Sequence, residues 1–256
     1  MSDPLVLAIP ARYNSTRLPG KPLQLLRGQP LIQHVVERAK QLEGASVIVA
    51  TDDSRVAEVA SKLGVLVVIT RNDHETGSDR LAEVAELCGW TEETRVVNLQ
   101  GDEPLMPLSC LATVIEALDS DPDASVATLA TPIRSIEEAF DPSCVKVVLD
   151  NSRRALYFSR APIPWFRDEW TRTPRALPNR PMFRHIGLYA YRARALRAFA
   201  RLPRMPLEDA ECLEQLRLLE HGFRISVRIA PEHVPPGVDT PADLLRVAAL
   251  MEMYEE

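Results

Sequence analysis

Short apolar runs alternate with stretches of helical periodicity through the first 150 residues of the chain. Apolar strands separated by amphipathic helices form parallel sheets that helices cover on both faces. Ligands of such sheets bind beyond the carboxyl ends of the strands, where the loops gather. The pattern therefore predicts an α/β fold with a ligand site along one sheet edge. The expected strands are residues 5–9, 46–50, 65–70, 95–99, 125–129 and 145–150, and the expected helices are about 31–42, 54–63, 78–88 and 108–118.

The alternation stops after about residue 150. Residues 151–184 hold five prolines and several aromatic side chains, which predicts a long segment poor in helix. The final helix is expected to begin near Pro241, with Thr240 as its N-cap. Between these points we expect a hairpin around 155–159, strands at 185–191 and 225–229, and helices near 193–200 and 210–221.

The bulk composition fits an ordinary globular protein and argues against several functional classes. The net charge of −6 disfavours nucleic acid as the main partner, because nucleic-acid binding needs a basic face. No apolar run reaches the length of about eighteen residues that spans a bilayer, and no signal-peptide pattern precedes the first strand. We therefore expect a cytoplasmic protein without membrane insertion. The four cysteines are scattered and contain no Cys-x-x-Cys pair, which favours buried, reduced thiols.

The loop after the first strand concentrates positive charge. Arg12, Arg17 and Lys21 lie in it, beside Gly20 and backbone N–H groups that a loop leaves unpaired. Fixed charge and free donors together bind phosphates, and the compact ammonium of a lysine suits a mobile triphosphate. The loop contains neither a Walker G-x-x-x-x-G-K-[ST] motif nor G-x-G-x-x-G, which argues against ATPases and dinucleotide dehydrogenases. A solvated surface loop is the structural alternative.

Two aspartates are candidates for holding a divalent cation. Asp102 follows a buried strand in Gln-Gly-Asp-Glu-Pro, and Asp239 lies between the last strand and the final helix. Mg²⁺ takes carboxylate oxygens and keeps phosphates and waters for its other positions, so this pair suits phosphoryl transfer. The alternative is that both are structural. Asp102 could cap a turn, and Asp239 could be a carboxylate that the dipole at the N-terminus of the final helix stabilises.

Two further groups of polar residues carry a weaker signal. The loop 71–80 contains Gly77 and Ser78, which would let backbone approach a planar base, and Ser78 could also cap the following helix. His74 in this loop is more simply a solvated side chain. Arginines beside neutral hydrogen-bonding groups suit a polyhydroxylated acid, and the second half offers Arg160, Arg167, His185, Tyr189, Glu214 and Gln215.

Several segments, in this order, resemble the signature of the 3-deoxy-manno-octulosonate (Kdo) cytidylyltransferases, also called CMP-Kdo synthetases. The longest is Ile-Pro-Ala-Arg-Tyr-x-Ser-Thr-Arg-Leu-Pro-Gly-Lys-Pro-Leu at residues 9–23. The resemblance spans nearly the whole chain, with Asn14 and Ser78 as departures that remove no needed group. The other matching segments are 50–53, 70–80, 98–104, 156–165, 184–189, 213–217 and 237–241.

The resemblance implies a nucleotidyltransferase-like, Rossmann-like α/β fold and a homodimer. It implies that CTP and Kdo give CMP-Kdo and pyrophosphate for lipopolysaccharide synthesis, with Mg²⁺ as the cofactor. The sugar's anomeric hydroxyl would attack the α-phosphate directly, without a covalent enzyme intermediate. Residues 1–150 would bind the nucleotide. Residues 151–256 would form a smaller α+β part, packed on the same sheet, that binds the sugar acid and forms the dimer.

The same resemblance implies roles for individual residues. Asp102 and Asp239 would hold the metal, and with Arg12 and Lys21 they would form the catalytic set. The implied nucleotide-binding residues are Pro10, Ala11, Arg12, Lys21, Arg71, Ser78 and Arg80. The implied sugar-binding residues are Gln100, Arg160, Arg167, His185, Tyr189, Glu214 and Gln215.

Three other functions fit parts of the pattern. A cytidylyltransferase for sialic acid or for 8-amino Kdo would share the nucleotide loop and differ in the acid pocket. A metal-dependent glycosyltransferase usually carries Asp-x-Asp at its metal loop, whereas residues 101–104 read Gly-Asp-Glu-Pro. A non-catalytic nucleotide-binding protein would need neither two distant aspartates nor a sugar-acid cluster.

Overall fold

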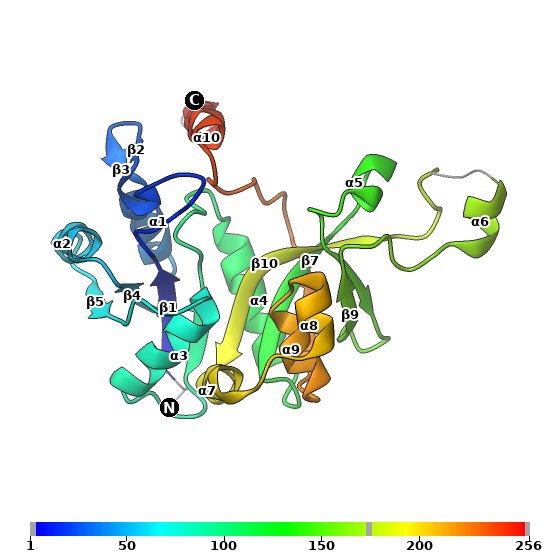
Figure 1. Cartoon of the computed structure of the whole chain (residues 1–256), viewed down its shortest axis with the longest axis horizontal. Coiled ribbons are helices and arrows are strands. Elements are labelled where there is room, and N and C mark those ends of the chain that lie inside the picture. Colours follow the sequence, from blue (N-terminus) through cyan, green and yellow to red (C-terminus); the bar gives the residue numbers. More distant parts are fainter. Residues whose placement is uncertain (1–3, 173–175, 254–256) are drawn as a thin grey trace.

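A nine-stranded mixed sheet forms the centre of the part of the chain that the computed structural model describes, residues 4–172 and 176–253 (Figure 1). Its main path runs in the order β11-β7-β10-β6-β1-β4-β5, with β8 and β9 attached at β10. The strands are β1 (Leu5–Pro10), β4 (Ser46–Thr51), β5 (Leu66–Ile69), β6 (Arg95–Asn98), β7 (Val126–Pro132), β8 (Lys146–Leu149), β9 (Ala155–Ser159), β10 (Phe183–Arg192) and β11 (Ile225–Ile229). A separate hairpin consists of β2 (Leu25–Leu26) and β3 (Gln29–Pro30).

Most neighbouring strands of the main path run parallel, as the alternating pattern predicted. β1 is parallel to β4 and β6, β4 to β5, and β7 to β11. β10 is the exception, because it lies antiparallel between β6 and β7. Its register sets Tyr189 opposite Asn98 at the carboxyl end of β6. A strand from the second part of the chain therefore brings its side chains to the edge where the N-terminal loops gather.

Helices cover both faces of the sheet, as expected. Side chains alternate along β1, so that Val6 and Ala8 join one buried cluster while Leu7 and Ile9 join the other. The first cluster includes residues of α3 and α7, and the second includes residues of α1 and α4. The helices are η1 (Lys21–Leu23, 3₁₀), α1 (Leu31–Lys40), α2 (Ser54–Lys62), α3 (Gly77–Leu87), α4 (Leu108–Asp119), α5 (Ile136–Phe140), α6 (Arg167–Arg172), α7 (Ala193–Arg201), α8 (Pro206–Glu211), α9 (Gln215–Glu220) and α10 (Pro241–Met253).

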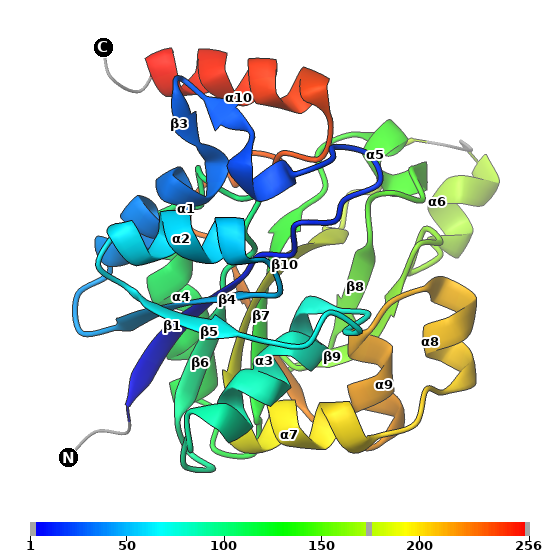
Figure 2. The same cartoon turned by 60° about the vertical axis from the view of Figure 1, so that its left-hand side comes forward.

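The last helix, α10, packs on the loop that carries Lys21. Figure 2 shows it next to the hairpin of β2 and β3, and a small apolar cluster that includes Leu18, Leu26, Val238 and Val247 joins these segments. Its start follows the sequence prediction, since the backbone N–H of Asp243 donates to Thr240 Oγ1 at 3.3 Å. None of the helices in the described ranges has the length and apolar character needed to cross a membrane.

The structure corrects several local predictions. The helix expected at 210–221 is divided into α8 and α9, because Cys212 adopts the left-handed conformation with φ 52°. This thiol is exposed rather than buried, and all four cysteines are unpaired. Thr76, not Ser78, caps α3, since Thr76 Oγ1 accepts a 3.1 Å hydrogen bond from the backbone N–H of Asp79. The hairpin expected around 155–159 is confirmed as the antiparallel pair of β8 and β9.

Candidate active site

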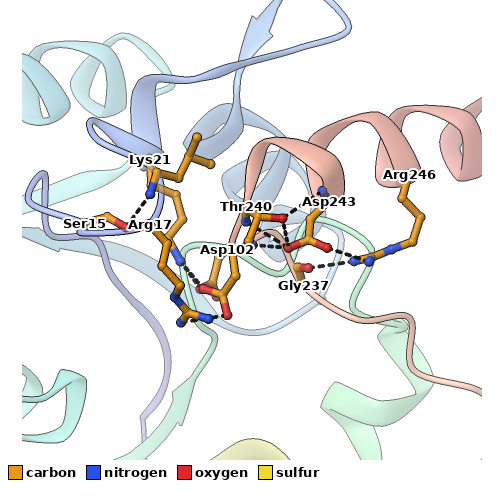
Figure 3. A network of polar contacts seen from close by, with 10 residues as sticks. Ser15, Arg17, Lys21, Asp102, Gly237, Thr240, Asp243 and Arg246 are labelled. Atoms are coloured by element: carbon orange, nitrogen blue, oxygen red, sulfur yellow. Dashed lines mark hydrogen bonds and ion pairs between the residues drawn. The ribbon is translucent and has the colours of Figure 1, made fainter. Parts of the chain in front are cut away.

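Three distant segments meet around the ammonium group of Lys21. Its Nζ lies 2.6 Å from Asp102 Oδ2 and 2.9 Å from Asp239 Oδ1 (Figure 3). Arg17 Nη2 contacts the other carboxylate oxygen of Asp239 at 3.0 Å. Partial burial opposes protonation of Lys21, but the two carboxylates outweigh that effect and raise its pKa. The two aspartates that the sequence singled out therefore face one point in space.

The loops that carry the two aspartates touch through their backbones. The N–H of Val238 donates a 2.8 Å hydrogen bond to the carbonyl oxygen of Asp102. A Cβ atom at Gly237 would lie 2.9 Å from that same oxygen, which is closer than real Cβ contacts come. Gly237 thus permits the close approach that sets Asp239 beside Asp102.

The backbone of Asp239 is held by the first turn of α10. Asp243 Oδ2 accepts hydrogen bonds from the backbone N–H groups of Asp239, at 3.0 Å, and of Thr240, at 2.9 Å. Arg246 Nη1 donates to the other oxygen of Asp243 at 2.6 Å (Figure 3). Burial acts to raise the pKa of Asp243, but these hydrogen bonds prevail and hold it at about 2. Asp243 therefore stays ionised and fixes the loop before the helix.

A cavity of about 550 Å³ opens over Lys21 at the carboxyl edge of β1. It gathers most of the expected nucleotide-binding set, and Arg12, Arg17, Lys21 and Arg80 are its cationic lining residues. Arg80 is buried in its wall, where Nη2 pairs with Asp52 Oδ2 at 2.8 Å and so ties α3 to the loop after β4. The expected residues that line this cavity are Pro10, Ala11, Arg12, Lys21, Arg80, Gln100, Asp102, Glu214 and Asp239.

A second cavity of about 410 Å³ adjoins the first. Gly77, Gln100, Asp102 and Glu214 line both, so the two cavities meet beside Asp102. A ligand in one cavity is thereby within reach of a ligand in the other. The predicted residues that line the second cavity are Ser78, Gln100, Asp102, His185, Tyr189, Glu214 and Gln215.

The second cavity presents mostly neutral hydrogen-bonding groups. Burial lowers the pKa of His185 to about 3, so its imidazole is neutral. His185 Nε2 lies 3.0 Å from Thr128 Oγ1, whose single proton has the carbonyl oxygens of Ile186 and Leu188 as acceptors. His185 Nε2 therefore carries the proton and donates to Thr128, which leaves Nδ1 as an acceptor. Burial also raises the pKa of Tyr189, which stays un-ionised.

Two buried polar atoms beside this cavity have no hydrogen-bond partner in the described structure. They are Gln215 Nε2 and Glu103 Oε2. Burial, together with the charge of Asp102, raises the pKa of Glu103 to about 8. Buried polar groups are normally paired, so these two atoms mark places where a polar ligand would be stabilised. The sequence interpretation missed Glu103, although its position directly after Asp102 was the available signal.

Three predicted arginines do not join either cavity. Arg71 pairs with Asp73 at 3.2 Å and lines a neighbouring groove beside α3 and α7. Arg160 donates to the carbonyl oxygens of Glu211, at 2.7 Å, and of Pro142, at 3.0 Å. Arg167 begins α6, which lies far from the carboxyl edge of β1 (Figure 1). Their assignment to nucleotide or sugar stays a prediction.

The two carboxylates beside Lys21 fit a magnesium ion whose remaining ligands are phosphates and water. Asp102 and Asp239 supply hard carboxylate oxygens that converge within hydrogen-bond distance of one cationic atom. The described residues contain no group of three or more histidine, cysteine, aspartate or glutamate side chains that could hold a metal alone. Mg²⁺ characteristically uses one or two carboxylates and completes its shell with substrate phosphates and water.

Comparisons with known proteins show the family of the chain. Residues 6–227 match the family model described as cytidylyltransferase. The 3-deoxy-manno-octulosonate cytidylyltransferase of Halorhodospira halophila is 52% identical, with 98% of this chain and 99% of the relative covered. The enzyme of the same name from Xylella fastidiosa strain 9a5c is 54% identical over 97% of each chain.

The chain belongs to the 3-deoxy-manno-octulosonate cytidylyltransferase family.

A solved structure extends this likeness to three dimensions. It is the structure of a CMP:2-keto-3-deoxy-manno-octonic acid synthetase complexed with CTP. It superposes with a TM-score of 0.89 at 44% sequence identity and covers 99% of this chain and 100% of its own. The nucleotidyltransferase-like fold expected from the family signature is thereby confirmed.

Proposed function

We propose that the protein transfers CMP from CTP to the anomeric hydroxyl of Kdo and releases pyrophosphate, with Mg²⁺ as the cofactor. The observation that carries the proposal is the convergence of Asp102 and Asp239 on Lys21 at the junction of two cavities. The first cavity is lined by cations and suits a triphosphate. The second offers hydrogen-bonding groups of His185, Tyr189 and Gln215 beside the carboxyl groups of Asp102 and Glu214, and suits the hydroxyl groups of a sugar acid.

The protein's contribution to such a displacement is placement and charge. Arg12, Arg17 and Lys21 offset the negative charge of the triphosphate, while Gln100 and Glu214 line the boundary between the cavities. Holding hydroxyl and α-phosphate in line avoids the entropy cost of a bimolecular encounter. Asp102 and Asp239 would hold the magnesium ion, which would offset charge on the reacting phosphates and lower the pKa of the attacking hydroxyl.

The sugar cavity is matched to neutral hydroxyl groups. His185 offers Nδ1 as an acceptor, because its Nε2 proton is engaged by Thr128. Gln215 offers an unpaired amide N–H. A site whose buried polar groups need a substrate hydroxyl discriminates strongly against analogues that lack it, since binding such an analogue leaves those groups unpaired.

The experiment that tests this function measures pyrophosphate release from CTP. Release is expected only when CTP, Kdo and Mg²⁺ are present together, and a chelator should abolish it. A panel containing 8-amino Kdo and sialic acid determines the sugar, and UTP in place of CTP determines the base. Binding of CTP without pyrophosphate release across the whole panel would contradict the proposal.

We propose further that the protein works in the cytoplasm, where it would supply CMP-Kdo for lipopolysaccharide synthesis, and that it forms a homodimer. The second part of the chain is the proposed dimer-forming region. Light scattering coupled to gel filtration tests the dimer, since a 28.6 kDa chain gives twice that mass when paired. A monomer at working concentration would exclude this assignment.

A further inference from the structure

The ammonium group of Lys21 occupies the place between Asp102 and Asp239 where a bound cation would lie. Its Nζ makes contacts of 2.6 and 2.9 Å with one oxygen of each carboxylate. Only 17% of the Lys21 side chain is exposed, so the contact is partly shielded from solvent. Arg17 covers the remaining oxygen of Asp239 at 3.0 Å. In this state the two carboxylates are already neutralised by the protein's own cations.

A divalent cation cannot use the same two oxygens while Lys21 stays in place. Metal–oxygen bonds of about 2.0–2.1 Å would bring Mg²⁺ almost onto the ammonium nitrogen. The two positive charges would also repel each other across a short distance in a partly buried site. Metal binding at this pair and the Lys21 contact are therefore mutually exclusive.

The same cavity offers Lys21 another anionic partner once nucleotide is present. Lys21 lines the cavity with Arg12, Ser15, Thr16 and Arg17, the segment expected to receive a triphosphate. Its side chain is a flexible four-carbon stem with three donors, so its head can move while its backbone stays fixed. The backbone is fixed by η1, which follows Gly20 at φ 65° and continues through buried Pro22. The chain has only four lysines against 26 arginines, so a lysine at this position is unusual for its composition. The rigid guanidinium group of an arginine would move less readily between the carboxylates and a phosphate.

We propose that Lys21, assisted by Arg17, is an exchangeable counter-ion that keeps the Asp102–Asp239 pair closed to free divalent cations. Entry of the triphosphate draws the ammonium group away from the carboxylates, so that the metal enters with the nucleotide. This inference rests on the proposed function in assigning CTP to the cavity. It extends that function, because the position of the Lys21 side chain would determine that the metal binds together with the nucleotide and not before it.

The decisive measurement is the affinity of the free protein for Mn²⁺ alone, followed by electron paramagnetic resonance without nucleotide. Lys21→Met is expected to bind Mn²⁺ about tenfold more tightly than the wild type, because the competing charge is gone. Arg17→Met is expected to bind it about two- to threefold more tightly, since its contact is more exposed. Lys62→Met removes a comparable lysine from a surface pair with Glu58 and should leave the affinity unchanged.

A second measurement is the affinity for CTP, which is expected to change in the opposite direction to the Mn²⁺ affinity in the same variant. With a chelator present, Lys21→Met should bind CTP more weakly than the wild type by calorimetry. Tighter metal binding together with weaker nucleotide binding is the signature of a shared counter-ion, which a purely structural role would not produce. Lys21→Met that binds Mn²⁺ no more tightly than the wild type overturns the proposal, even if the enzyme transfers CMP normally.

A third measurement follows the wild-type side chain directly and does not depend on a variant remaining folded. The four lysines allow ¹H–¹⁵N spectra of the ammonium groups to be assigned individually. Addition of CTP without metal should shift the Lys21 signal and leave that of Lys62 unchanged. An unchanged Lys21 signal in a protein that binds CTP overturns the proposal, whereas absence of CTP binding counts against the proposed function instead.

Discussion

The backbone N–H of Val238 donates a 2.8 Å hydrogen bond to the carbonyl oxygen of Asp102. This bond joins the loop after β6 to the loop before α10, so a direct backbone contact holds the two carboxylate-bearing segments together. The site is therefore preorganised by its backbone, and the separation of Asp102 and Asp239 depends on how closely the two loops approach.

Gly237→Ala tests that dependence. The new Cβ would lie 2.9 Å from the Asp102 carbonyl oxygen and 3.3 Å from Glu103 Cγ, so the loop must shift. We expect the turnover number to fall about tenfold or more, since small misplacements at a reacting centre are costly. Gly89→Ala is the control, because it strains a glycine at φ 60° with nothing within 4 Å of the new Cβ. Both variants should lose stability in urea unfolding, but only Gly237→Ala should lose turnover.

Asp239→Asn tests the electrostatic role of the second carboxylate. The amide keeps the shape and hydrogen-bonding reach of the side chain but removes its charge. We expect turnover with Mg²⁺ to fall by about 10²-fold or more, with a smaller change in the KM for Kdo. Steady-state kinetics with both substrates measure this. Near-normal turnover would remove Asp239 from the proposed metal site.

Asp243→Asn tests how α10 supports the site. The pKa of Asp243 is held at about 2, below its ordinary value, so its contribution to stability is present at neutral pH and is lost as the pH falls from about 4 to 2. We expect the variant to be about 2 kcal/mol less stable than the wild type at pH 7, and the gap to close near pH 2. Urea unfolding across this range measures the gap. Asp73→Asn, which makes the same exchange at an exposed loop carboxylate, is the control for the stability at pH 7.

His185 provides a pH test of the second cavity. Its pKa is lowered to about 3 in the folded protein. Between about pH 6.5 and pH 3, His185 is therefore protonated in the unfolded chain but neutral in the folded protein. Stability contributed by His185 should therefore fall as the pH drops from about 6.5 toward 3. NMR of the imidazole nitrogens should show Nε2 protonated and Nδ1 unprotonated at pH 5. A His185 signal that titrates near pH 6.5 would exclude this assignment.

Local patterns were enough to predict most elements around the site. Leu5–Pro10 is apolar throughout and becomes a central strand, and Asp53 accepts from the backbone N–H of Arg55 to cap α2 just where the helix was expected. These features depend on neighbouring residues along the chain, whose periodicity and capping chemistry the sequence displays. The break at Cys212 escaped prediction, because a left-handed non-glycine residue has no local signal.

The sequence by itself determined the α/β class, the cationic loop with its lysine and the two candidate aspartates. Only the tertiary structure decided that Lys21 contacts Asp102 and Asp239 across 81 and 218 residues, and that β10 inserts antiparallel and brings His185 and Tyr189 to the second cavity. The tertiary structure also leaves Arg71, Arg160 and Arg167 outside the lining of both cavities. The physical reason is that periodicity and capping are local, whereas the meeting of distant loops depends on the packing of the whole sheet and on a glycine that lets two backbones touch.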